Sequence, residues 1–189
     1  MTAGRRINTK SQSWCTPPKY VNAVRKVLNY IYLDPCSNDD SVVNALTEFK
    51  LPETDGLEET WNFPTIYVNP PYGLDKIRGT SIKNWIAKCS EANSKFGSEV
   101  MALIPVATNT RHWKDYIFKT ANSICFLYDT RLKFIIEGSL DNKGAPMAWA
   151  MIYWGENIEK FAEVFSKFGA CVDLKNLKLP KEEASLFDD

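Results

Sequence analysis

The residues best suited to chemistry form one tetrad, Asn69-Pro70-Pro71-Tyr72. Two consecutive prolines cannot continue a β-strand, because each lacks an N–H group and fixes φ at about −65°. The β-rich run 65–68 before them therefore predicts a short strand that ends just before Asn69. An amide, a rigid backbone carbonyl and an aromatic ring then meet at a strand tip, where ligands bind in open α/β sheets. This combination suits binding an exocyclic amine and stacking on its ring; a purely structural proline-rich turn is the alternative.

The elements that must position this tetrad follow from apolar periodicity and from turn residues. Thr16 is expected to cap a first helix, with Pro17 as its first residue, and Ser81 and Gly97 are expected to bound a second. A helical turn or two is predicted in 37–45, a short helix over 113–118, and a last helix over 158–168. Strands are predicted over 31–33, 48–51, 65–68, 100–104, 123–128 and 148–154.

This order of elements indicates a single layered α/β domain. The first strands are expected to be parallel and central, and the last two, joined through 131–147, to pair antiparallel. We expect a flexible basic lead over 1–12, one domain over 13–179 and an acidic tail over 180–189.

Composition narrows the class of protein. The 189 residues are 44% hydrophobic and 24% charged, without an apolar run long enough for a membrane span or a signal peptide, which indicates a cytoplasmic globular protein. Five scattered cysteines and one histidine support neither a disulfide framework nor a metal site. The net charge is zero, but residues 1–33 carry six Lys or Arg and no acid, so a basic face remains open.

Several motifs in a fixed order carry a family resemblance. They are Trp14-Cys15-Thr16-Pro17, Leu33-Asp34-Pro35-Cys36-Ser37, Asp55-Gly56-Leu57 with Trp61, the tetrad with Gly73, Ile104-Pro105, Thr110-Arg111-His112-Trp113, Arg131-Leu132-Lys133-Phe134 and Ala145-Pro146. Together they span residues 14–154, and in this order they resemble the small phage-type DNA N6-adenine methyltransferases. The resemblance implies a Rossmann-like S-adenosylmethionine-dependent methyltransferase fold, complete or trimmed, and a phage or prophage protein in a bacterial host.

The resemblance also implies roles for these residues. Asn69 and Pro70 would accept the two N6–H bonds of adenine, and methyl transfer would be direct, with Pro71 and Tyr72 completing the site. Tyr72 would stack on a flipped-out base. The implied residues for S-adenosylmethionine are Trp14, Thr16, Pro17, Asp34, Pro35, Cys36, Ser37, Asp55 and Asn69; those for DNA are Tyr72, Gly73, Arg111, Arg131 and Lys133. Glu48 and Glu53 are candidates for the ribose of the cofactor.

Two features of the sequence keep alternatives open. The chain has no glycine between Gly4 and Gly56, whereas the broader methyltransferase pattern has a glycine-rich turn after its Asp-Pro pair. A degenerate methyltransferase fold that only binds is therefore an alternative. The tetrad also suits an RNA adenine or a protein glutamine amide, because a planar amide nitrogen poses the same chemical problem. The resemblance favours DNA.

Overall fold

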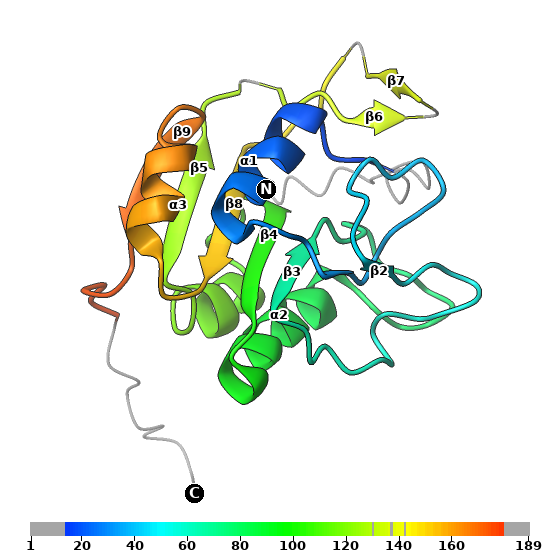
Figure 1. Ribbon diagram of the computed structural model, residues 1–189, viewed down its shortest axis with the longest axis horizontal. Coiled ribbons are helices and arrows are strands. Elements are labelled where there is room, and N and C mark those ends of the chain that lie inside the picture. Colours follow the sequence, from blue (N-terminus) through cyan, green and yellow to red (C-terminus); the bar gives the residue numbers. More distant parts are fainter. Residues whose placement is uncertain (1–13, 130, 137, 142, 180–189) are drawn as a thin grey trace, which may run out of the picture.

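The protein is built around a seven-stranded sheet (Figure 1) in the order β2-β1-β3-β4-β8-β5-β9. The computed structural model describes residues 14–129, 131–136, 138–141 and 143–179; the expected basic lead and acidic tail lie outside this part. The strands are β1 (Leu33–Asp34), β2 (Thr47–Glu48), β3 (Thr65–Val68), β4 (Glu99–Pro105), β5 (Ser123–Leu127), β8 (Trp149–Trp154) and β9 (Gly169–Asp173).

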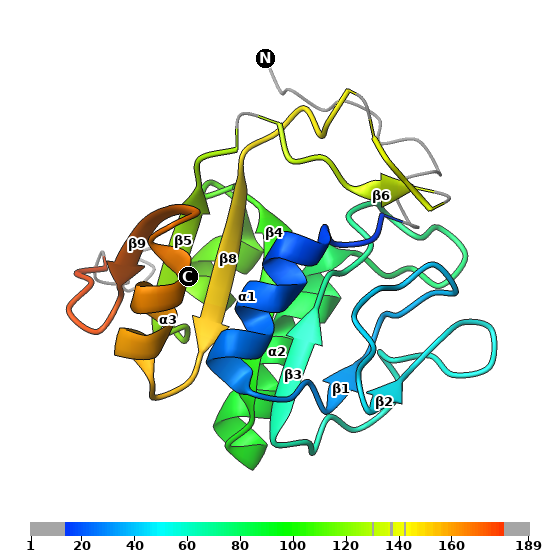
Figure 2. The same cartoon turned by 45° about the horizontal axis from the view of Figure 1, so that its top comes forward.

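The strand directions confirm the predicted Rossmann-like arrangement. Strands β1, β2, β3 and β4 pair in parallel. Strand β8 lies between β4 and β5 and is antiparallel to both, so β5 runs in the same direction as the first four. Figure 2 shows β3 running toward the end of the sheet that carries β6, and β8 running away from it. The carboxyl tips of β1, β3, β4 and β5 therefore share one edge, where a site is expected.

Helices cover both faces of this sheet. The helices α1 (Pro18–Leu28) and α3 (Ile158–Phe165) pack on one face (Figure 1), while α2 (Ile82–Phe96) and the π-helical turn η2 (Trp113–Ile117) pack on the other. Strand β4 shows how the sequence specifies two cores. Its Met101 and Leu103 side chains join the α1 and α3 side, and Val100, Ala102 and Ile104 join the α2 side, as alternation along a strand requires.

The second helix has the predicted boundaries. The Ser81 N–H donates to Asn84 Oδ1 at 3.0 Å, which fixes the first turn. Gly97 ends the helix with φ at 70°, and its N–H donates to Asn93 O at 2.9 Å. A residue with a side chain rarely adopts this left-handed conformation, so the glycine marks the end of the helix in sequence and in structure.

The start of the first helix differs from the prediction. The helix begins at Pro18, Pro17 occupies the cap position, and no side chain caps it. Since Pro18 has no N–H, a cap at Thr16 would have little to accept from. The Thr16 hydroxyl instead lies 2.7 Å from the hydroxyl of Tyr67, where both are buried.

The predicted helical turn in 37–45 is also wrong. Asn38 Oδ1 accepts from the Asp40 N–H at 2.9 Å, Ser41 Oγ accepts from the Val43 N–H at 3.2 Å, and Asn44 has φ at 45°. These side chains bond the backbone locally and so compete with a helix. The segment is an irregular loop between β1 and β2.

Two elements have no counterpart in the prediction. Strand β9 adds an outer edge beside β5, where Gly169 is required because a Cβ there would lie 2.0 Å from Phe126 O. Strands β6 (Ile135–Ile136) and β7 (Ser139–Leu140) form a separate hairpin. Cys15 and Ile135 exchange backbone hydrogen bonds of 2.9 Å, which join this hairpin to the chain before α1.

Candidate active site

The predicted tetrad and the predicted cofactor loop meet at one edge of the sheet. Asn69 follows β3 directly, and Asp34 ends β1, which pairs with β3 through Leu33 and Ile66. The Asp34 side chain is 4% exposed and accepts the Cys36 N–H at 3.2 Å. The adjacent parallel strands thus present an amide and a carboxylate side by side.

Burial makes the Asp34 carboxyl an unusually weak acid. Desolvation raises its pKa from 3.8 to about 7. The hydrogen bond from the Cys36 N–H lowers this pKa, and the negative charge of Glu48 raises it further. A buried carboxylate next to another acid is unfavourable unless a cation joins it. This position therefore favours a positively charged ligand.

Hydrogen bonds fix both ends of the Asn69 side chain. Its Nδ2 donates to the backbone carbonyl of Trp14 at 2.6 Å, and its Oδ1 accepts from the hydroxyl of Tyr72. The bond from Asn69 Nδ2 to Trp14 O sets the direction in which the amide oxygen faces. The contact with Trp14 ties the segment before α1 to the tip of β3.

Aromatic rings surround Tyr72, which is 8% exposed. Its ring centroid lies 4.7 Å from that of Trp149, 6.1 Å from that of Phe134 and 6.2 Å from that of Trp14. Trp14 also stacks on Phe134 at 5.0 Å. The predicted base-stacking residue is therefore covered by other rings, and only the movement of a ring would open its face to a base.

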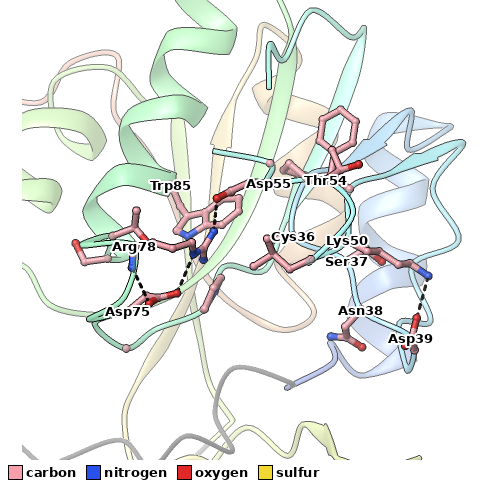
Figure 3. A pocket seen from close by; sticks show the side chains of 18 residues that line it. Cys36, Ser37, Asn38, Asp39, Lys50, Thr54, Asp55, Asp75, Arg78 and Trp85 are labelled. Atoms are coloured by element: carbon pink, nitrogen blue, oxygen red, sulfur yellow. Dashed lines mark hydrogen bonds and ion pairs between the residues drawn. The ribbon is translucent and has the colours of Figure 1, made fainter. Parts of the chain in front are cut away.

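A cavity of about 260 Å³ opens beside the cofactor loop. Figure 3 shows it between the 36–39 loop with Lys50 on one side and Asp55, Asp75 and Arg78 on the other. A second cavity of about 10 Å³ lies between Asp34, Trp14 and Asn69. Cys36, Ser37 and Asn38 line both.

The hydroxyl of Ser37 stands out in this shared wall. Its Oγ is buried and has no hydrogen-bond partner among the described residues. A buried hydroxyl without a partner costs free energy. A polar ligand in either cavity would supply the missing bond.

A short turn around Gly56 lines the larger cavity and packs against the cofactor loop. A Cβ at Gly56 would lie 1.8 Å from the carbonyl oxygen of Pro35, so only glycine allows this approach. Trp61, which is 1% exposed, donates its indole N–H to Gly56 O at 2.7 Å and fixes the turn. Gly56 therefore allows the backbone of this turn to pack closely against the 34–37 loop.

Arg78 forms an ion-pair bridge that the sequence analysis missed. Its Nη1 lies 2.6 Å from Asp55 Oδ2, and its Nε lies 2.8 Å from Asp75 Oδ2 (Figure 3). Although burial opposes it, the hydrogen bond from Arg78 holds the pKa of Asp55 below its ordinary value. The Asp75-to-Arg78 spacing could have indicated a local pair, but nothing in the sequence indicates the contact with Asp55.

The predicted DNA contacts follow the tips of β4 and β5, which lie at the same edge of the sheet with β8 between them. Arg111 follows β4, has a side chain 84% exposed and lies 3.7 Å from Asp115. Arg131 and Lys133 are exposed beyond β5 and line a cavity of about 410 Å³. Gly144, with φ at 64°, packs against Arg131, where a Cβ would lie 2.6 Å from the Arg131 Cβ.

Some predicted residues lie apart from this site. Pro17 lines the cavity of Arg131 and Lys133 rather than either cavity beside Asp34. Neither Glu48 nor Glu53 lines the larger cavity, so the acidic group in its wall nearest the cofactor loop is Asp39.

Two further properties bear on the class of site. Among the described residues, no cluster of three or more His, Cys, Asp or Glu side chains is placed to hold a metal ion. None of the helices in that part of the chain has the length and apolar character needed to cross a membrane.

Comparison with known proteins gives a family match. Residues 5–176 match the family described as DNA N-6-adenine-methyltransferase (Dam), which is most of the chain. A search of curated proteins gives no match.

Proposed function

Since the chain belongs to the Dam family of DNA N-6-adenine methyltransferases, we propose that the tips of β1 and β3, with the cavities beside them, form its active site. Its activity is methyl transfer to the N6 amine of adenine in DNA, and the family selects DNA from the acceptors that the tetrad alone left open. The observation that carries the proposed site is Asn69, held by Trp14 and Tyr72 beside the buried carboxyl of Asp34.

We propose S-adenosylmethionine as the methyl donor. When bound, it supplies a methyl group on a positively charged sulfur. The site suits such a cation, because Asp34 is a buried carboxyl near the negative charge of Glu48, and the Ser37 Oγ has no hydrogen-bond partner among the described residues. Asp34 would hold the ammonium group of the donor, and Ser37 would bond to one of its polar groups. Asp55 would accept from the amine of the donor's own adenine. Trp14 and Thr16 would border the donor in the smaller cavity, Pro35 in the larger cavity, and Cys36 in both.

The acceptor amine is proposed to bind at the tetrad. Its nitrogen is a poor nucleophile because its lone pair is delocalised into the ring. Asn69 Oδ1 and the Pro70 carbonyl would each accept one N6–H bond, which favours a tetrahedral nitrogen and directs its lone pair. The Trp14 carbonyl keeps the Asn69 amide in the required orientation, since it accepts from the amide nitrogen.

The target adenine must leave the duplex to reach this edge. Flipping costs a few kcal/mol, and stacking on an aromatic ring returns about 1–3 kcal/mol per base. We propose that Trp14 moves away from Phe134 and Tyr72, so that the base stacks on Tyr72 in its place. Arg111, Arg131 and Lys133 would contact DNA phosphates near the same strand tips.

Methyl transfer from labelled S-adenosylmethionine to DNA tests this site. Replacement of Asn69 by alanine is expected to lower turnover about 100-fold or more, as the loss of one oriented catalytic dipole does elsewhere. Asn62→Ala makes the same change at an exposed asparagine before β3 and is the control. Wild-type turnover in Asn69→Ala, or no binding of S-adenosylmethionine by calorimetry, would contradict the proposed site.

A further inference from the structure

A braced turn follows the tetrad and projects from this edge of the sheet. Asp75 and Thr80 exchange backbone hydrogen bonds of 2.9 and 3.2 Å. Asp75 Oδ1 accepts from the N–H groups of Ile77 and Arg78 at 3.0 and 3.1 Å. Arg78 then anchors the turn to Asp55. These contacts, with Gly79 at φ 67°, hold the turn in one conformation.

The tip of this turn is apolar and faces solvent. The Ile77 side chain is 99% exposed, and Leu74 is 63% exposed. Lys76 beside them is also exposed. Single exposed aliphatic residues are common on protein surfaces. Here the side-chain and backbone bonds of the turn hold these residues in their exposed position.

The position of the turn indicates its partner. Gly73 follows Tyr72 directly, and Pro71, Asp75 and Arg78 line the larger cavity. One side of the turn therefore forms part of the proposed active site, while its tip points outward, where the duplex must lie when its adenine reaches Asn69. The partner nearest this tip during the reaction is the base stack that the adenine has left.

We propose that Ile77, assisted by Leu74, inserts into the DNA duplex and fills the space left by the flipped adenine. Aliphatic side chains act as such wedges in other DNA-binding proteins, because base faces are apolar and an unfilled gap is unfavourable. Lys76, exposed next to Ile77, would contact a DNA phosphate. The proposal rests on the active site proposed above and adds the surface that holds the duplex open.

Two duplexes that differ at one position test the wedge. Both carry a mapped methylation site; in the second, an abasic residue replaces the thymine opposite the target adenine, so that the adenine leaves the stack without a wedge. Ile77→Ala is expected to lower kcat/KM about 10- to 100-fold on the paired duplex, the factor expected from one buried aliphatic side chain. On the abasic duplex it should match the wild type. Leu46→Ala, at an aliphatic residue 68% exposed before β2, is the control, and Ile77→Leu should restore activity.

The outcomes separate the wedge from the site on which it rests. Equal losses on the two duplexes would overturn the wedge and indicate a general binding contact or a contact between proteins. No loss on either duplex would also overturn it. A wild-type enzyme that methylates neither duplex would instead contradict the proposed active site.

Discussion

Replacement of Asp34 by asparagine is expected to stabilise the protein at alkaline pH while it abolishes cofactor binding. The carboxyl has a pKa of about 7 in the folded protein against 3.8 as a free group. The folded protein therefore binds more protons than the unfolded chain between these values, and the free energy of unfolding falls as the pH rises through this window. At 1.36 kcal/mol per pKa unit, this shift corresponds to about 4 kcal/mol of unfolding free energy that is lost above pH 7.

Asparagine has a similar shape and carries no proton to lose. Asp34→Asn should therefore exceed the wild type by up to about 4 kcal/mol at pH 8 and by less than about 1 kcal/mol at pH 4. Urea unfolding at several pH values measures the two curves, and calorimetry measures binding of S-adenosylmethionine. Asp173→Asn, at an exposed carboxylate on β9 that lies away from both cavities, is the control. Parallel stability curves for Asp34→Asn and the wild type would refute the reasoning, because Asp34 would then not titrate abnormally.

Two further predictions concern the loop support and the DNA contacts. Gly56→Ala places a Cβ 1.8 Å from Pro35 O, so it should lower the free energy of unfolding by about 1–3 kcal/mol and weaken cofactor binding. Gly73→Ala is the control and should be tolerated, because a Cβ there meets nothing within 4 Å. Equal stabilities of the two variants would contradict this reasoning. Arg131→Ala or Lys133→Ala should weaken DNA binding and reduce the slope of log K against log salt by about 1. A slope matching that of Lys175→Ala, at an exposed lysine beyond β9, would remove them from the interface.

Local signals in the sequence were sufficient for β3, which carries the tetrad, whereas β1 lies at Leu33–Asp34 rather than over 31–33. The apolar run 65–68 is stopped by two prolines, and the order of later runs predicted both the parallel sheet and the antiparallel pair of β5 and β8. These predictions succeed because strand ends depend on residues next to each other in sequence. The same holds for Ser81 and Gly97 at the ends of α2.

Contacts between distant segments could not be predicted in this way. The bridge from Arg78 to Asp55 joins residues 23 positions apart, and the bond from Asn69 to Trp14 joins residues 55 apart. The covering of Tyr72 depends on Phe134 and Trp149, which reach it only through the folding of the sheet. Because Tyr72 is buried, Tyr72→Ala would remove core packing as well as the proposed base-stacking ring.

The position of β8 has a consequence for synthesis of the chain. Strands β4 and β5 are complete at residue 127, but the strand that joins them ends only at Trp154. When a ribosome has released the chain only as far as residue 148, the edges of β4 and β5 that β8 would cover are unpaired, and such edges are sites for pairing with other chains. Nonsense mutations before residue 149 should consequently give aggregated products rather than shortened enzymes.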